Sequence, residues 1–331
     1  MHIPDGLMDP VVALIGWAEF VIVIGATLII LRNRIKEKDL PRVAVLSAGI
    51  FVAQMLNFPI GGGTTGHLIG GALFAIMAGP LLAMVGMTVI LLIQALMFGD
   101  GGITALGLNA LNMAIIAPLS GWGIYNMLNQ ISFGNRKSDA GRTKSFWDSI
   151  PVACSAWASV FLAACACAAE LSVSYAISGG RYGIAAPVSI PAVLGYHAVI
   201  GVGEAAITVG ILAYINNVAS KSPSRTSGDG KTAIRLGRTE PSKTIWAAVA
   251  ILIVFALALP LYFVYASEGR DGLEQTMDNA NVQEGSPVLT APFSYGENYF
   301  AALFMGIVGF VVVALLCTGM IRLLGRGHGP E

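Results

Sequence analysis

Two histidines stand at positions where they could bind a metal ion. His2 directly follows Met1, and His67 ends the glycine-rich stretch GGGTTGH. The α-amino nitrogen of Met1, the backbone nitrogen of His2 and Nδ1 of His2 can close a five-membered and a six-membered chelate ring on one ion. Planar nitrogen coordination is typical of Ni(II) or Cu(II). His67 could supply the fourth nitrogen of the plane.

The protonation of these nitrogens sets the conditions for binding. An α-amino group has an ordinary pKa near 8, so it gives up its proton easily near neutral pH. The amide proton of His2 is harder to displace, and we expect metal affinity to fall on acidification. The alternatives to a metal-binding role are that His2 lies at a frayed terminus and that His67 is a structural histidine bonded to loop carbonyls.

Other polar residues fall within or beside apolar runs. His197 and Glu204 are seven residues apart and share a helix face. They would form either a proton relay or a polar tie between helices, with Asn109 or Asn112 as a partner. His328 lies in the C-terminal tail and has no functional interpretation. Three further carboxylates are expected at span ends or in an outside turn: Glu19, Glu170 and Asp100.

The elements that position these residues are predicted to be membrane helices. The chain has 331 residues, 55% hydrophobic and 11% charged, whereas soluble domains carry about 25% charged residues. A span needs about 20 apolar residues. This criterion predicts an all-α polytopic membrane protein with nine helices, at 11–31, 43–57, 68–83, 85–98, 104–129, 149–177, 189–217, 244–266 and 297–324.

The basic residues indicate the orientation of these helices. Nine spans with the N-terminus outside place 17 of the 19 lysines and arginines in cytoplasmic segments and leave Arg181 and Arg270 outside. The C-terminus is then inside. The formal net charge of zero gives no reason to expect nucleic acid as a partner. The apolar helices are expected to contact membrane lipid.

Composition divides the chain into two modules. Residues 220–243 are rich in Ser, Gly and Lys and are predicted to be a flexible cytoplasmic linker. Residues 1–219 would form a seven-helix binding module, and residues 244–331 a separate two-helix module with an acidic outside loop. The stretch before His67 is not helical, and such backbone reaches membrane depth only where protein or a cavity surrounds it.

Three stretches carry a family resemblance: MHIPDGLM, GGGTTGHLIGGALFAIMAGP and LMFGDGGITALGLNALNMAIIAP. They resemble the substrate-binding membrane component of nickel/cobalt energy-coupling-factor (ECF) transporters, the CbiM/NikM family, over residues 1–219. Asp271-Gly272-Leu273-Glu274 is similar to the PDGLE segment of NikN-type accessory subunits, with Arg270 in place of the proline. The fused arrangement resembles NikMN-type proteins and favours nickel over cobalt.

The resemblance implies metal ligands and partners. The ligands would be the Met1 amino nitrogen, the His2 amide and imidazole, and the His67 imidazole. The partners would be a transmembrane coupling subunit and cytoplasmic ATPase subunits, in the cell membrane of a prokaryote. The sequence contains no GxxxxGK[ST] phosphate loop of its own.

Two other functions are weighed against this nickel-uptake subunit. A stand-alone proton-coupled transporter would use His197 and Glu204. A membrane metalloenzyme would need an open coordination position, but His67 completes the plane and leaves no equatorial place for a reactive water. The sequence therefore predicts a protein that is not an enzyme.

Overall fold

A computed structural model describes residues 1–32, 34–35, 40–61, 63–133, 149–220, 241–266 and 269–325. Most of them are helical, and six described helices are long and apolar enough to cross a membrane. They are Pro10–Arg32, Pro80–Phe98, Ile150–Ile177, Ala186–Ile215, Ile245–Tyr265 and Tyr299–Leu324. The prediction of a helical, multi-pass membrane protein is confirmed, while the count of nine spans and their orientation stay predictions.

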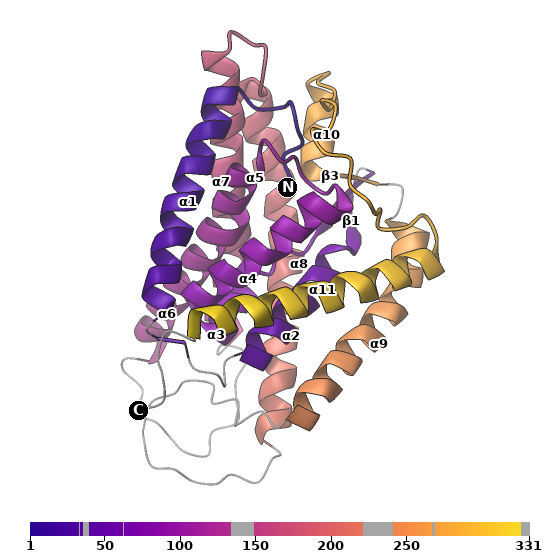
Figure 1. Cartoon of the computed structure of the whole chain (residues 1–331). Helices are drawn as coiled ribbons and strands as arrows, with labels where there is room; N and C mark the ends of the chain where they lie inside the picture. The colour runs from indigo at the N-terminus through magenta and orange to yellow at the C-terminus, as the bar shows by residue number, and fades with distance from the viewer. Residues whose placement is uncertain are drawn as a thin grey trace.

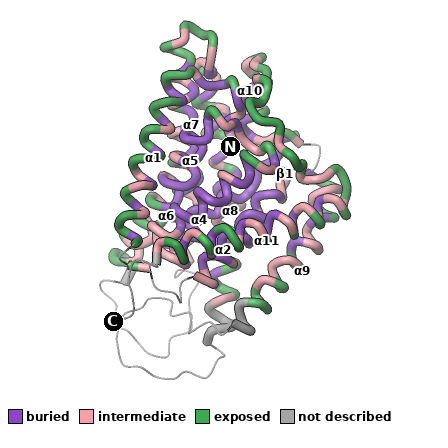
Figure 2. Tube along the Cα trace, viewed as in Figure 1, coloured by how far each residue is buried: buried purple, intermediate pink, exposed green. Residues whose placement is uncertain are grey.

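The first two thirds of the chain form a helical bundle (Figure 1). Its helices are α1 (Pro10–Arg32), α2 (Leu40–Gln54), α3 (Gly71–Ala78), α4 (Pro80–Ile93), η2 (Gln94–Phe98), α5 (Leu106–Ala110), η3 (Leu111–Ile116), α6 (Ala117–Phe133), α7 (Ile150–Ile177) and α8 (Ala186–Ser220). α7 packs between α6 and α8. α4 and η2 are central, because 72% of their most apolar stretch is buried inside the protein, whereas only 28% of that of α1 is buried (Figure 2).

Two predicted helix boundaries are wrong. The break expected between residues 83 and 85 lies at Gly79, which has a φ of 89°, and α4 starts at Pro80. Glycine adopts this backbone conformation without steric cost, and proline fits the first helical position. α3 therefore has eight residues, about 12 Å. The predicted helix at 104–129 consists of α5, η3 and α6, and η3 is a π-helical segment.

The glycine-rich stretch before His67 forms a hairpin. Strands β1 (Asn57–Gly61) and β2 (Thr64–His67) pair antiparallel, and β2 also pairs in parallel with β3 (Arg270–Asp271). All four residues of β2 are buried. The hairpin thus places His67 inside the protein and joins it to a strand from the C-terminal part of the chain, which the sequence did not predict.

The C-terminal helices α9 (Pro241–Tyr265) and α11 (Tyr299–Gly325) pack on α2, and α11 also packs on α4. A Cβ at Gly309 would overlap the Phe51 ring, so glycine permits the close approach of α11 to α2. In the sequence, the segment between α9 and α11 was predicted to be a loop and contains α10 (Gly272–Asn279), which is capped by Asp271 and Glu274 and packs on α8. The two-helix unit is thus in contact with the bundle, and most of its predicted linker lies outside the described residues.

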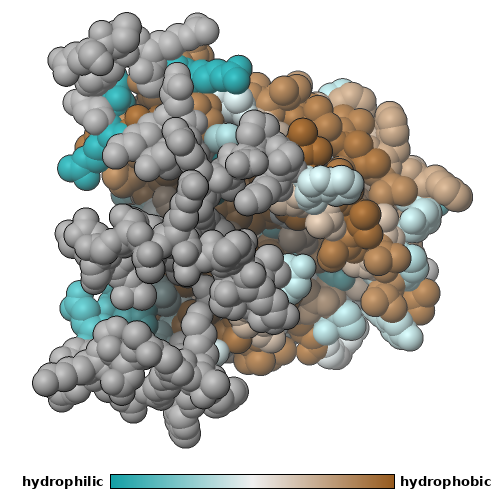
Figure 3. All heavy atoms as spheres, turned by 90° about the horizontal axis from the view of Figure 1, so that it is seen from below, coloured by the Kyte–Doolittle hydropathy of each residue, from teal (hydrophilic) through white to brown (hydrophobic). Residues whose placement is uncertain are grey.

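Large apolar side chains on the outer helices face away from the protein. Examples that are more than 60% exposed are Leu14 and Ile22 on α1, Leu257 and Val264 on α9, and Phe300 and Leu315 on α11. In the view from below, brown apolar residues prevail over the part of the face that the grey atoms leave visible (Figure 3). An apolar surface of this extent fits the hydrocarbon interior of a membrane.

Candidate metal site

The N-terminal segment runs from α1 into the bundle, and the N-terminus lies beside α5 (Figure 1). Met1, Ile3 and Leu7 are buried. Ile3 donates its N–H to Asn109 Oδ1 at 2.8 Å, and its carbonyl accepts from Asn109 Nδ2 at 3.1 Å and from the Gly102 N–H at 2.8 Å. These bonds fix the backbone beside His2. The interpretation of His2 as a residue at a frayed terminus is therefore wrong.

The structure brings Met1, His2 and His67 together. The α-amino nitrogen of Met1 lies 3.3 Å from Nε2 of His67. The His2 and His67 rings are stacked with their centroids 5.2 Å apart. Two nitrogens bound to one ion at about 2 Å lie about 3 Å apart when adjacent, so the Met1 and His67 nitrogens are close to the separation that a shared ion requires.

The loop after β2 fixes which nitrogen of His67 faces Met1. Nδ1 of His67 lies 3.0 Å from the carbonyl oxygen of Leu68. A carbonyl only accepts, so Nδ1 carries the proton and Nε2 presents its lone pair toward Met1. Burial, and then the charge of the Met1 ammonium, lower the pKa of His67. The ring is therefore in the neutral form that binds metals.

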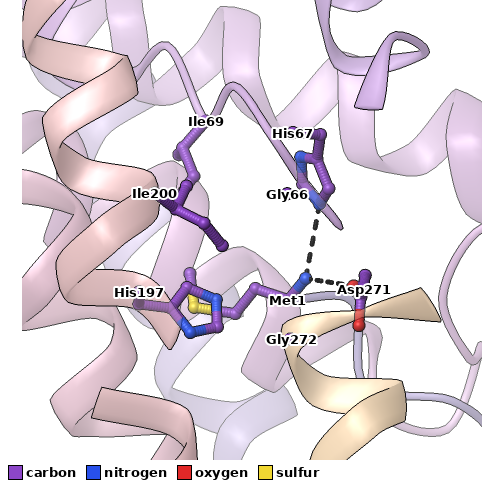
Figure 4. A pocket seen from close by; sticks show the side chains of 8 residues that line it. All are labelled: Met1, Gly66, His67, Ile69, His197, Ile200, Asp271 and Gly272. Carbon is purple, nitrogen blue, oxygen red and sulfur yellow. Dashed lines mark hydrogen bonds and ion pairs between the residues drawn. The ribbon is translucent and has the colours of Figure 1, made fainter. Parts of the chain in front are cut away.

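A carboxylate from the C-terminal part of the chain contacts the Met1 nitrogen. Asp271 Oδ2 accepts from it at 2.8 Å (Figure 4). Burial favours the neutral form of both groups, but their opposite charges outweigh it. The pKa of the Met1 amino group is consequently above its ordinary value, and the pKa of Asp271 is below its own. The amine is held as an ammonium in this arrangement.

A second carboxylate faces His2. Asp100 Oδ1 lies 3.1 Å from Nδ1 of His2, and Asp100 Oδ2 accepts from the Tyr295 hydroxyl at 2.8 Å. Burial, and then the neighbouring Asp100 carboxylate, raise the pKa of Tyr295 well above its ordinary value. Tyr295 is therefore a permanent donor. Asp100, expected in an outside turn, is thus held against His2 by a residue of the C-terminal loop.

A small cavity adjoins the Met1 nitrogen. The volume open to the centre of a water molecule is about 10 Å³, which is enough for about one water molecule. Its lining is shown in Figure 4 and consists of Met1, Gly66, His67, Ile69, His197, Ile200, Asp271 and Gly272. A space of this size excludes an ion that keeps its shell of water. Among the described residues, His, Cys, Asp and Glu side chains alone form no metal-binding group of three.

His197 and Glu204 have other partners than those predicted. Nδ1 of His197 lies 2.8 Å from the Val193 carbonyl of its own helix. Glu204 is buried and accepts from the N–H groups of Ile69 and Gly70, both at 2.7 Å. These N–H groups precede α3 and have no partner within it, so they suit a carboxylate. Glu204 therefore ties α8 to the segment that follows His67, and its partners are not Asn109 or Asn112.

Glu170 has a partner that the sequence did not predict. It lies within α7, where its Oε2 accepts from Asn112 Nδ2 at 2.8 Å. Asn112 belongs to the π-helical segment η3. The pair joins α7 to η3, and the interfacial position predicted for Glu170 stays a prediction.

Sequence reasoning missed the residues that surround the nitrogens. Gln94 Oε1 lies 3.2 Å from Nε2 of His2, and Gln94 Nε2 donates to Gln54 Oε1 at 2.8 Å. Asp271 and Tyr295 approach from a distant part of the chain. The two glutamines carried a signal, since polar residues inside apolar spans are expensive and tend to be functional. Tyr295 carried none.

Comparison with known proteins agrees with this architecture. The sequence profile of the family described as the CbiM cobalt uptake substrate-specific transmembrane region matches residues 2–222. A putative fused nickel transport protein NikMN of Archaeoglobus fulgidus is 31% identical over 332 residues, covering 97% of this chain and 98% of the relative. A putative metal transport protein of Haloquadratum walsbyi is 40% identical over 215 residues, covering 65% and 89%.

A solved structure is also similar. A crystal structure of a transition metal transporter shares 35% identity, with a TM-score of 0.58, and the match covers 67% of this chain and 95% of that one. The fold and these matches define a multi-pass membrane protein of the metal transporter class. More specifically, the chain belongs to the CbiM family, within the nickel and cobalt transport proteins, and it resembles their fused NikMN forms over its full length.

Proposed function

We propose that this protein is the metal-binding subunit for nickel uptake, in preference to cobalt, of an ECF-type ABC transporter. The observation that carries the proposal is the buried approach of the Met1 amino nitrogen to Nε2 of His67 at 3.3 Å, with the His2 ring stacked beside them. The full-length relative is named for nickel. Nitrogen donors alone do not separate nickel from cobalt, but planar coordination favours nickel.

The proposed site is a plane of four nitrogens. They are the Met1 amine, the backbone nitrogen and Nδ1 of His2, and Nε2 of His67. To bind the ion, the Met1 amine must leave Asp271 and Nδ1 of His2 must leave Asp100. Asp271 and the Asp100 partner Tyr295 both belong to the loop between α9 and α11. This loop, residues 268–296, would therefore control loading from outside.

Release of the ion would require energy from partners. The chain has no GxxxxGK[ST] segment, and CbiM family members are components of cobalt and nickel transport systems. We place residues 1–219 in the binding module and residues 244–331 in the NikN-like module, joined by the linker 220–243. A transmembrane coupling subunit and cytoplasmic ATPase subunits would then drive a conformational change that releases nickel inward.

The test compares the native chain with the variant His67→Ala. The substitution removes the proposed fourth nitrogen of the plane and leaves the Met1 amine, the His2 amide and Nδ1 of His2 in place. Bound metal is measured by elemental analysis and visible absorption. We expect one nickel ion with a diamagnetic, square-planar spectrum in the native chain and a changed or lost spectrum in the variant. Equal spectra and equal metal content in both proteins would refute the site.

The alternative is a stand-alone transporter that uses His197 and Glu204 as a proton relay. Both Glu204 oxygens already accept from backbone N–H groups, and His197 bonds its own helix, so neither contact favours a relay. Uptake by this chain alone, in vesicles with a proton gradient and no ATPase, would establish that function instead.

A further inference from the structure

Two buried glutamines connect His2 to the backbone that follows His67. His2 Nε2 lies 3.2 Å from Gln94 Oε1, Gln94 Nε2 lies 2.8 Å from Gln54 Oε1, and Gln54 Nε2 lies 2.7 Å from the carbonyl oxygen of Ile69. Gln54 and Gln94 are 3% and 0% exposed, so water does not compete for these groups. The three contacts form one continuous chain across α2 and η2.

The direction of this chain is fixed at its far end. The Ile69 carbonyl can only accept, so Gln54 must turn its NH₂ group toward it and its oxygen toward Gln94. Gln94 must then donate to that oxygen and turn its own oxygen toward His2. An amide oxygen also only accepts, so Nε2 of His2 must carry the proton. The side-chain amide orientations, which are otherwise ambiguous, follow here from one backbone group.

The consequence for His2 is a choice between two tautomers. In the neutral ring, a proton on Nε2 leaves the lone pair on Nδ1, which is the nitrogen that can close a six-membered chelate ring with the His2 amide, whereas a protonated ring would donate to both Gln94 and Asp100. Asp100 acts in the opposite direction, because its carboxylate lies 3.1 Å from Nδ1 and favours a proton there. If Gln94 were free to flip, its NH₂ group would face Nε2 and His2 would adopt the tautomer that Asp100 favours.

Both candidate ligand rings depend on the same backbone segment. His67 bonds the carbonyl of Leu68, and the glutamine chain ends on the carbonyl of Ile69. Glu204 holds that segment in place through the N–H groups of Ile69 and Gly70. A shift of this segment would therefore change the orientation of both rings together.

We infer that Gln54 and Gln94 are positioning residues that hold His2 in the tautomer with Nδ1 available, and thereby set the affinity of the chain for nickel. The inference rests on the proposed function, because it assumes that Nδ1 of His2 is a ligand. Hydrogen-bond partners of metal-binding histidines typically change affinity about 10- to 100-fold when removed.

The test uses two substitutions at Gln54 in the full chain. Gln54→Leu removes the anchor on Ile69 and the acceptor of the Gln94 NH₂ group, which weakens the preference of Gln94 for one orientation. Gln54→Glu keeps it, because the new carboxyl, when protonated, donates to Ile69 and accepts from Gln94. We expect the nickel Kd to rise about 10- to 100-fold for Gln54→Leu, and to stay within about 3-fold of the native value for Gln54→Glu. A packing role alone predicts the reverse, since a buried carboxyl is tolerated less well than leucine.

The second readout is ¹⁵N NMR of histidine-labelled, metal-free protein. Nε2 of His2 should give a protonated-type signal in the native chain and in Gln54→Glu, and a largely unprotonated-type signal in Gln54→Leu. Adding Asp100→Asn to Gln54→Leu should restore the protonated signal and part of the affinity, because the pull on Nδ1 is removed. Thermal melting of each variant shows that it is folded.

Two results would overturn the inference. One is a Gln54→Leu variant with native Kd and native Nε2 signal, and the other is an equal loss of affinity in Gln54→Leu and Gln54→Glu. Failure of the proposed function gives a different pattern, since His2→Ala would then bind nickel as the native chain does, while the Nε2 signals would still report the glutamine chain.

Discussion

The α-amino nitrogen of Met1 donates to Oδ2 of Asp271 at 2.8 Å, although 270 positions separate the two residues. The other oxygen of Asp271 accepts from the N–H groups of Leu273 at 2.7 Å and Glu274 at 2.8 Å and so begins α10. One carboxylate therefore fixes the start of a helix in the C-terminal part and the first residue of the chain.

Asp271→Ala should destabilise the protein strongly. The change removes one partner of a buried ion pair and the N-cap of α10, and loss of one buried partner typically costs about 3 to 5 kcal/mol. The measurement is thermal melting in detergent. Glu274→Gln is the matched control, because glutamine also completes a capping box. Its free energy of unfolding should lie within about 0.5 kcal/mol of that of the native protein. Equal melting of both variants would show that Asp271 does not hold the two parts together.

Glu204→Gln should weaken both stability and nickel binding. A glutamine has one acceptor oxygen where the carboxylate has two, and its NH₂ group would face the N–H of Ile69 or Gly70. Leaving such a buried donor without an acceptor costs about 1 to 3 kcal/mol. Melting and nickel titration measure the two effects. His197→Gln is the comparison, since a proton relay requires it to abolish uptake, whereas the structural role of Glu204 predicts that uptake persists.

Asp5 should make stability depend on pH in the acid range. It accepts from the N–H and hydroxyl of Thr104, at 2.8 and 2.7 Å, and from the N–H of Val288 at 2.9 Å. Burial opposes these bonds, but they prevail and lower the pKa of Asp5 below its ordinary 3.8. A depressed pKa contributes stability that is present above about pH 4 and is lost as the pH falls through the folded-state value.

Asp5→Asn should therefore lower stability at pH 7 by about 1.5 to 3 kcal/mol, the range for hydrogen bonds to a charged group. The difference from the native protein should begin to shrink below about pH 4, where the unfolded carboxyl takes up a proton, and shrink further as the pH falls through the depressed pKa of the folded state. Melting curves at pH 3 and pH 7 measure both. A difference that is constant over this range would show that the Asp5 charge plays no part.

Gly102→Ala should expel the N-terminal segment from the bundle. A Cβ at this position would overlap the backbone nitrogen of Asp5 and lie 2.6 Å from the carbonyl carbon of Pro4. Backbone atoms cannot move aside as a flexible side chain can, and overpacking of this kind costs about 1 to 3 kcal/mol. Nickel affinity should fall because Met1 and His2 belong to this segment.

Gly25→Ala is the control for this change. A Cβ at Gly25, on α1, meets nothing within 4 Å, and alanine favours a helix over glycine by about 1 kcal/mol. Its nickel affinity should equal that of the native chain. Equal nickel affinity in Gly102→Ala would mean that the segment tolerates displacement, and the proposed site would not depend on its depth.

Several features followed from local sequence. Long apolar runs predicted the spans at α1, α7, α9 and α11 to within a few residues, because hydropathy is a property of consecutive residues. The end of the short helix α3 was predicted at residue 83 and not at Ala78, since the apolar pattern continues through Gly79-Pro80, although this pair is itself a signal for a helix start. The loop holding α10 was recognised by its DGLE motif, but its pairing with β2 was not.

For the candidate site, the sequence by itself identified Met1, His2 and His67, because the chelating geometry of the first two is fixed by covalent bonds and the third stands in an irregular segment. Only the tertiary structure decided that Asp271 contacts Met1, that Tyr295 holds Asp100 against His2, and that Gln94 and Gln54 orient the His2 ring. These contacts join residues that are far apart in the sequence. No local pattern encodes them, because they depend on how all the helices and the hairpin pack at once.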